Sequence, residues 1–154
     1  MSKIHSFDFE YDHDYILIGI HTTLNDYRLA YFLNKELKLF LKRFKDDLDF
    51  PLKKCGFPFY LYEDEASFIS WSLISNKYIS VDSVQSDNNL FNEETKTRFL
   101  IPEKKKVDYF IKICGYIKNE KLKNILSKIK KTEKIITSYT IDPYTLKSRD
   151  NLIF

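Results

Sequence analysis

Apolar runs and amphipathic stretches alternate along the chain in a pattern that predicts both strands and helices. Residues 15–21 form a continuous apolar run that ends at polar threonines, as expected for a strand covered on both faces. Thr23, followed three residues later by Asp26, resembles a capping box, and leucine and alanine then recur at helical spacing. The first part of the chain therefore predicts a strand and then a helix over about 24–36.

The middle of the chain carries mainly strand patterns. Residues 39–44 fit either a strand that ends at an acidic turn or an extension of the preceding helix. Aromatic and β-branched runs at 57–62 and 67–74, separated by a short polar connection, predict a hairpin. Alternation in its second strand predicts one apolar face and one wettable face. The polar stretch at 82–95 then predicts a mobile loop.

The last third of the chain returns to regular patterns. Residues 97–102 and 109–114 predict a strand pair, with Pro102 at an edge or a strand end because proline cannot donate a ladder hydrogen bond. Asn119 is placed to cap a helix through about 130, in which leucine and isoleucine form one apolar stripe. Residues 135–141 then predict a final strand.

These elements place a strand-helix-strand unit near each end of the chain, with a meander between them. The sequence therefore predicts one α+β domain over 1–154, with two layers, a mostly antiparallel sheet and two main helices. Ferredoxin-like and ACT-like arrangements are the candidate topologies. A length of 154 residues suits one domain with a single core.

The composition predicts a soluble protein in a reducing compartment. Hydrophobic residues make up 44% and charged residues 31% of the chain, which is a typical globular balance. Cys55 and Cys114 are too few and too far apart for a disulfide framework. The first residues lack the pattern of a secretory signal, and no apolar run approaches the roughly 20 residues that span a bilayer. We therefore expect a cytoplasmic protein without a membrane partner.

The residues that most often carry chemistry form no recognisable site. Three histidines and three acids lack the ligand spacing of known metal sites, so we expect neither a metal nor a cofactor: His5, His13, His21, Asp8, Asp12 and Asp14. Either cysteine would need a histidine brought close by the fold to become a thiolate, and buried inert thiols are the favoured interpretation. Acidic runs at 46–49 and 63–65 could hold a cation, but solvated turns are favoured.

Motifs for nucleotide or acyl chemistry are also absent from the sequence. The chain has 3 glycines, and it contains no phosphate-binding loop, no dinucleotide fingerprint and no Gly-x-Ser-x-Gly elbow. No catalytic residue is predicted, so a non-catalytic protein is the favoured interpretation. A catalyst without a recognisable motif stays an open alternative.

The most specific motif lies between residues 100 and 110. Here Ile101-Pro102-Glu103 and Val107-Asp108-Tyr109 flank a run of three lysines. This spacing resembles the signature of a family of small bacterial proteins, associated with Bacteroidota and named for those residues. Further stretches are similar to the same family: 26–29, 73–77 and 146–154. The resemblance covers nearly the whole chain; it implies a cytoplasmic bacterial protein and carries over no particular activity.

The signature has a functional and a structural interpretation. Functionally, a group of polar residues binds a partner. Arg28 from the first helix belongs to this group, and its other members are Glu103, Lys104, Lys105, Lys106 and Asp108. Structurally, Pro102 ends a strand, Asp108 satisfies backbone donors and Tyr109 enters the core. The structural interpretation is favoured because proline and aspartate so often mark turns.

The C-terminus offers another candidate surface for a partner. Leu152, Ile153 and Phe154 are apolar side chains at the end of the sequence. Such a terminus either tucks into the domain or docks into a partner's groove. Truncation of residues 151–154 is expected to separate these alternatives, because a docking tail can be lost without unfolding the domain.

Positive charge is concentrated in one segment. Residues 103–134 contain 11 lysines and 4 acids, whereas the rest of the chain carries a net charge of −4. A lysine-bearing helix can approach phosphates, and the nucleic-acid-binding candidates are Lys121, Lys128, Lys130, Lys131 and Lys134. A solvated lysine face is the favoured alternative, and lysines without arginine suit bidentate recognition poorly.

Three classes of function follow from these observations. The first is a non-catalytic interaction domain that binds a protein partner through a sheet edge, the lysine turn or the C-terminal tail. The second is RNA or ribosome-associated binding through the lysine helix, which predicts strong salt dependence. The third is small-molecule sensing, as in ACT-like domains, which predicts a pocket. The protein partner ranks first.

Overall fold

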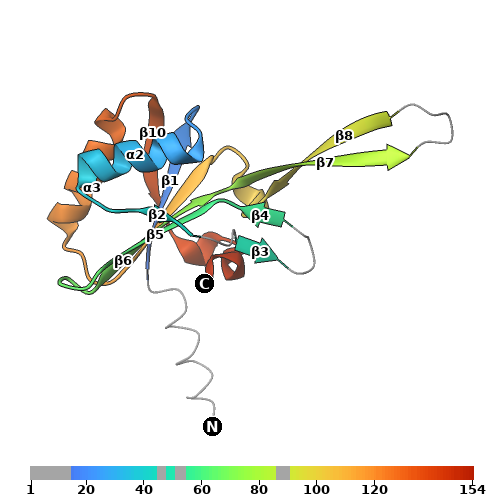
Figure 1. The fold of residues 1–154 in the computed structure, drawn as a ribbon. Helices are drawn as coiled ribbons and strands as arrows, with labels where there is room; N and C mark the ends of the chain where they lie inside the picture. The colour runs from blue at the N-terminus through green and yellow to red at the C-terminus, as the bar shows by residue number, and fades with distance from the viewer. Residues whose placement is uncertain (1–14, 45–47, 51–54, 86–90) are drawn as a thin grey trace, which may run out of the picture.

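A six-stranded antiparallel sheet forms the centre of the molecule (Figure 1). The computed structural model describes residues 15–44, 48–50, 55–85 and 91–154. Across the sheet the strands follow the order β10-β1-β9-β6-β5-β2, and every pairing is antiparallel. The bounds of the strands are β1 Ile16–Thr22, β2 Lys42–Arg43, β5 Phe59–Asp64, β6 Ile69–Ser75, β9 Tyr109–Cys114 and β10 Ile135–Ile141.

Both predicted helices are present and cover one face of this sheet. They are α2 (Asp26–Leu37) and α3 (Asn119–Lys131), and their apolar stripes are buried against the sheet. Neither begins as expected, since Asn25 and Lys118 occupy the cap positions and make no side-chain cap bond. The predicted pairing of Thr23 with Asp26 is therefore wrong. The carboxylate of Asp26 has other partners on β2 and β5.

The order of the strands defines two split β-α-β connections. Because β9 and β10 are both antiparallel to β1, α3 joins two parallel strands that lie on either side of β1. By the same reasoning β1 and β6 are parallel and flank β9, and the chain between them includes α2. The predicted α+β class with a mostly antiparallel sheet and two helices is confirmed, and the strand order suggests a ferredoxin-like core.

Both faces of the sheet are buried, each under a different cover. The helices pack on one face, where Ile18 and Ile20 of β1 meet the apolar stripes of α2 and α3. The other face is covered mainly by the signature segment and the C-terminal residues, which contribute Leu100, Ile101, Val107, Leu146 and Leu152. The expected wettable face of β6 is therefore wrong, and Ser72 is only 6% exposed.

Gly19 allows the signature segment to lie close against β1. A Cβ atom at this position would lie 2.8 Å from Cδ1 of Ile141 and 3.3 Å from Cγ2 of Val107. The first distance is too short for real carbon atoms. A glycine in the middle of β1 is thus explained by packing of two apolar side chains onto its backbone.

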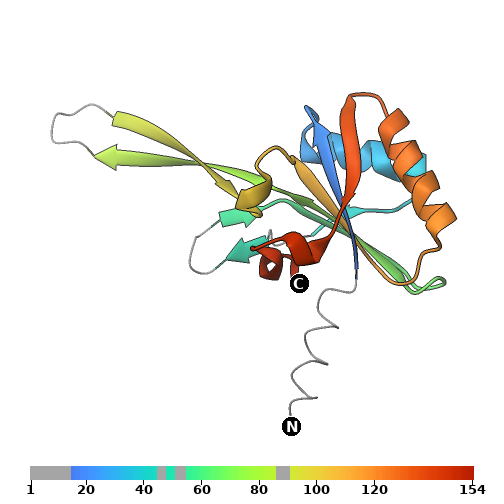
Figure 2. The ribbon, with the colours of Figure 1, turned by 180° about the vertical axis from the view of Figure 1, so that it is seen from behind.

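A long two-stranded arm extends from the body of the molecule (Figures 1 and 2). It consists of β7 (Lys77–Gln85) and β8 (Phe91–Phe99), which pair along their whole length. The prediction of a loop over 82–95 is therefore wrong at 82–85 and 91–95, while 86–90 lie outside the described residues. The predicted pairing of 97–102 with 109–114 is also wrong, because β8 pairs with β7 and β9 pairs with β1 and β6.

The remaining elements are short. A small hairpin consists of β3 (Leu48–Phe50) and β4 (Cys55–Phe57), and three 3-10 turns follow later in the chain: η1 Pro102–Lys104, η2 Pro143–Thr145 and η3 Arg149–Leu152. The strand expected over 39–44 is reduced to the two residues of β2, with Leu39 and Leu41 buried in the core. Within the described ranges, no helix combines the length and the apolar character needed to span a membrane.

Candidate functional site

The side chain of Asn76, between β6 and β7, binds the signature segment from inside. Its Nδ2 donates to the carbonyl oxygens of Lys104 and Val107, each at 2.8 Å. Its Oδ1 accepts from the backbone N–H of Ile101, also at 2.8 Å. Asn76 is fully buried, and its bonds to Val107 and Ile101 are shielded from water. One amide thus fixes both ends of the lysine turn.

The signature residues Asp108 and Tyr109 are also engaged within the domain. One carboxylate oxygen of Asp108 accepts from the backbone N–H of Thr22 at 2.9 Å, and the other accepts from Nζ of Lys77 at 2.8 Å. The buried hydroxyl of Tyr109 donates to the carbonyl oxygen of Leu24 at 2.9 Å. Burial raises the pKa of Tyr109 well above its usual value, so this hydroxyl keeps its proton. These contacts fit the structural interpretation of the signature.

Glu103 connects the signature to the C-terminal segment. Its carboxylate accepts from the backbone N–H of Ser148 at 2.7 Å and from the Ser148 hydroxyl at 2.9 Å. Burial on its own would raise the pKa of Glu103, but the hydrogen bonds from Ser148 and its neighbours outweigh burial and lower it. Nearby, Nδ2 of Asn151 donates to the carbonyl oxygen of Leu100 at 2.8 Å.

The C-terminal residues dock into this domain. Leu152 is fully buried, and the ring of Phe154 packs edge-on against Phe59 at 5.1 Å between ring centroids. Lys112 of β9 is also buried; its Nζ donates to the carbonyl oxygen of Leu152 at 2.7 Å and lies 4.5 Å from the Phe154 ring and 4.7 Å from the Tyr15 ring. Burial raises the pKa of Tyr15 to about 12. Of the three tail candidates, Leu152 is thus part of the core.

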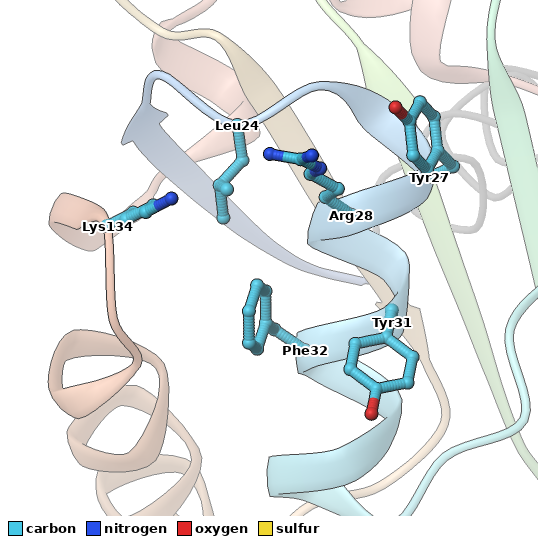
Figure 3. A pocket seen from close by; sticks show the side chains of 6 residues that line it. All are labelled: Leu24, Tyr27, Arg28, Tyr31, Phe32 and Lys134. Carbon is cyan, nitrogen blue, oxygen red and sulfur yellow. The ribbon is translucent and has the colours of Figure 1, made fainter.

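An open hollow of about 500 Å³ lies beside the first half of α2. We call it the α2 hollow, and its lining residues are Leu24, Tyr27, Arg28, Tyr31, Phe32 and Lys134. The lining is almost entirely apolar. Figure 3 shows that Arg28 and Lys134 point toward one another across Leu24, with the ring of Phe32 below them. The hollow therefore combines an apolar floor with two cations at its rim.

The signature residues hold the walls of this hollow in place. The Thr22 hydroxyl donates to the carbonyl oxygen of Lys134 at 2.7 Å and accepts from the backbone N–H of Leu24 at 3.1 Å. The backbone of Thr22 is itself bound by Asp108, and Leu24 is bound by Tyr109. Two signature side chains therefore fix the backbone on both sides of the α2 hollow without lining it.

The two cations of the hollow have no anionic partner among the described residues. Neither Arg28 nor Lys134 takes part in a hydrogen bond or ion pair of its side chain there, although both are exposed. Lys134 also adopts a left-handed φ of 67°, which is unusual for a residue with a Cβ atom and often marks a functional position. The hollow can therefore take an anionic group that is attached to an apolar one.

The predicted group of Arg28 with the signature carboxylates does not form. Within the described part of the chain, Arg28 bonds to neither Glu103 nor Asp108, which are engaged by Ser148 and by Thr22. The lysine turn itself stays at the surface: Lys105 and Lys106 are exposed, and Nζ of Lys105 lies 5.9 Å from the ring of Phe99.

The lysines proposed for nucleic-acid binding divide over three surfaces. Lys121 and Lys128 line a cleft between α3 and the turn that joins β5 to β6. Lys130 and Lys131 line a shallow hollow on another side of α3. Lys134 lines the α2 hollow. The structure therefore brings these five residues together only in part.

The cleft beside α3 has a volume of about 220 Å³ and a mixed lining. Lys38 joins Lys121 and Lys128 there, beside the ring of Trp71. The one carboxylate in the lining is that of Asp64, whose hydrogen bond from Ser67, at 2.6 Å, is the main cause of its lowered pKa. The cleft can therefore attract a small anion.

The other candidate chemistry is not assembled in the described residues. His21 of β1 forms a hydrogen bond of 3.0 Å with the Tyr139 hydroxyl. His5, His13 and the three acids near them lie outside the described residues, and so does the acidic run at 46–47. Within the described ranges, no three histidine, cysteine or acidic side chains gather as a metal site would require. Cys114 is a partly buried free thiol.

Comparisons with protein-family models, with curated proteins and with solved structures found no match to this chain. The resemblance to the bacterial family with the Ile-Pro-Glu and Val-Asp-Tyr signature therefore stays a prediction. A proposal of function therefore rests on the geometry of the surface.

Proposed function

We propose that this chain is a non-catalytic interaction domain that binds an acidic segment of a protein partner in the α2 hollow. The observation that supports this proposal is a pair of cations, Arg28 and Lys134, that point toward one another over an apolar floor and have no anionic partner among the described residues. A carboxylate between them would gain charge-assisted hydrogen bonds, and Arg28 can offer a carboxylate two parallel donors.

The apolar lining of the hollow determines which kind of residue must lie next to the acidic residue of the partner. Tyr27 and Tyr31 are 60% and 63% exposed beside the hollow, and Phe32 and Leu24 form its floor and wall. An ion pair at an exposed site contributes at most about 1 kcal/mol by itself, so useful affinity needs apolar contact as well. The partner segment therefore carries an acidic residue next to an aromatic or aliphatic one.

A protein segment suits the α2 hollow better than a metabolite does. Small-molecule sites usually enclose most of their ligand, whereas this hollow is open to solvent. An open apolar hollow with exposed tyrosines and an arginine has the composition of an interface hot spot, where one or two side chains of a partner anchor.

Selection from a random peptide library displayed on phage tests this proposal. The intact protein should enrich peptides in which an acid adjoins an aromatic or aliphatic residue. Arg28→Glu should weaken binding of a selected peptide at least tenfold, by charge repulsion. Lys35→Glu is the matched control, because Lys35 is exposed on the same helix but does not line the hollow. Equal binding by the Arg28→Glu variant would contradict the proposal.

A second candidate function is the sensing of a small anion in the cleft beside α3. Three lysines and a buried tryptophan line that cleft, which is a fitting environment for a phosphate joined to a flat ring. A nucleoside monophosphate should then raise the melting temperature of the protein but not that of a Lys38→Glu, Lys128→Glu variant. RNA binding has less support, because its five lysine candidates do not form one continuous track.

A further inference from the structure

One edge of the main sheet is open. No described strand pairs with the outer side of β10, which lies beside α3 at the boundary of the sheet (Figures 1 and 2). The opposite edge strand, β2, has two residues, Lys42 and Arg43, and both are charged. Shortness and charge are common means by which proteins prevent an edge from pairing with another chain. β2 has both of these features.

β10 lacks the features that protect β2. It has seven residues, Ile135–Ile141, without a charge or a proline among them. Ile136 is 72% exposed, so the strand presents a large apolar side chain together with its unpaired backbone groups. A strand of this length and composition is competent to pair with an incoming extended segment.

A buried hydroxyl on β10 has no partner in the part of the chain that the structure describes. The Oγ atom of Ser138 is shielded from solvent and forms no hydrogen bond there. Unsatisfied buried polar atoms are uncommon in folded proteins and call for an explanation. Ser138 lies opposite Ile20, on the face that the helices cover. A residue directly across from Ser138 on an added strand would be close enough for a side-chain contact.

The charge beside this edge is positive. α3 packs against β10, and Lys121 and Lys128 lie on the side of α3 that faces the cleft shared with the end of α2. Lys123, Lys130 and Lys131 lie together on another side of α3, are exposed and line a shallow hollow. Residues 119–141 carry 6 lysines and 2 glutamates. Acidic side chains on the helix face of an added strand would lie near this positive surface.

We propose that β10 accepts an extended acidic segment of a partner protein as a seventh strand of the sheet. Backbone hydrogen bonds to the outer side of β10 contribute affinity whatever the sequence of the segment. Alternate acidic side chains of the segment face Lys123, Lys130 and Lys131. This surface is separate from the α2 hollow, so the two proposals can fail independently.

Synthetic peptides of ten residues test the proposal on the intact protein. A peptide that alternates glutamate with valine should bind at least tenfold more tightly than one that alternates lysine with valine, and higher salt should weaken it. N-methylation of the alternate amides that face β10 should abolish binding, because those ladder donors are lost, whereas N-methylation of the other set should leave binding intact. The Lys123→Glu, Lys130→Glu, Lys131→Glu variant should lose the preference for acid, whereas Arg28→Glu should keep it.

Several outcomes would overturn the proposal. Undiminished binding of both N-methylated peptides would show attraction by charge alone. Tighter binding of a ten-nucleotide single-stranded RNA to the same lysines would assign the surface to nucleic acid. Tighter binding of a peptide with the sequence of residues 5–14, in which acids alternate with aromatic residues, would assign the edge to a segment of this chain rather than to a partner. Failure of every peptide to bind would also refute it.

Discussion

The signature segment and the α2 hollow both carry polar residues near the molecular surface, but they use them in opposite ways. Glu103 and Asp108 of the signature, and Asn76 beside it, direct their side chains to backbone groups of the same domain. In the hollow, Arg28 and Lys134 have no such partner among the described residues. A polar side chain that binds backbone groups of its own domain stabilises the fold, whereas a cation without a partner there can bind a ligand.

The difference matters because the side chains of the more specific sequence motif are less available to a ligand than those of the hollow. Asp108 and Tyr109 do not line the hollow, yet they fix the backbone of Thr22 and Leu24 that shapes it. The signature is thus best described as a support for the α2 hollow. Substitutions in the two regions should separate stability from binding.

The largest effect is expected for Asn76→Ala, which removes the amide that binds the signature from inside. Two buried backbone groups, the carbonyl oxygen of Val107 and the N–H of Ile101, lose their bond to Asn76, and at roughly 1–3 kcal/mol for each unsatisfied group we expect a loss of about 4 kcal/mol in the free energy of unfolding. Urea denaturation followed by circular dichroism measures it. Asn124→Ala, at an exposed position on α3, should change stability by less than about 0.5 kcal/mol. Similar values for both variants would contradict the structural role.

An intermediate effect is expected for Tyr109→Phe, which links the two regions. Loss of the hydroxyl leaves the carbonyl oxygen of Leu24 without its donor, and should lower the free energy of unfolding by about 1 kcal/mol. A peptide selected on the hollow should also bind several-fold more weakly, because Leu24 is less firmly held. Tyr116→Phe is the control, since Tyr116 is 84% exposed. If stability falls while peptide affinity is unchanged, the signature does not support the hollow.

The smallest effect is expected for Glu103→Gln, and it should depend on pH. The pKa of Glu103 in the folded chain lies below its ordinary value of 4.5, so its charge stabilises the fold above that pH and the stabilisation is lost as the pH falls through the lowered pKa. At pH 7 the variant should be less stable by a few tenths of a kcal/mol, because the group is largely exposed. The stability difference between the two proteins should shrink as the pH falls below 4.5.

Glu65→Gln controls for the loss of one surface charge at pH 7, because Glu65 is exposed at the turn between β5 and β6. A stability difference for Glu103→Gln that does not change between pH 7 and pH 3 would mean that the bonds of Glu103 to Ser148 contribute nothing measurable.

Local pattern was sufficient for the regular elements of the body. The apolar run at 15–21, the two amphipathic helices and the strand at 135–141 follow directly from the spacing of apolar residues, because burial imposes that spacing. The arm was missed for the same reason. Where a strand pair projects from the core, burial does not impose alternation, and a polar stretch such as 82–95 resembles a loop.

The sequence did not predict which strands pair or which distant residues the fold brings together. The choice of β1 and β6 as neighbours of β9, in place of β8, depends on contacts between segments far apart in the chain. Arg28 and Lys134 were singled out separately, for different functions, and only the fold brings them to one hollow. Asn76 and Lys112 carried no local signal, because a single polar residue next to an apolar run looks the same whether it is buried or exposed.

The position of β1 also bears on how the protein is synthesised. β1 is synthesised long before both of its neighbours in the sheet, β9 and β10. Until those strands emerge from the ribosome, the nascent chain therefore holds an apolar strand with neither edge paired, and Leu152 joins the core later still. The centre of the sheet must assemble after β10 has emerged, which makes β1 a natural segment for chaperones to bind and for premature termination to expose.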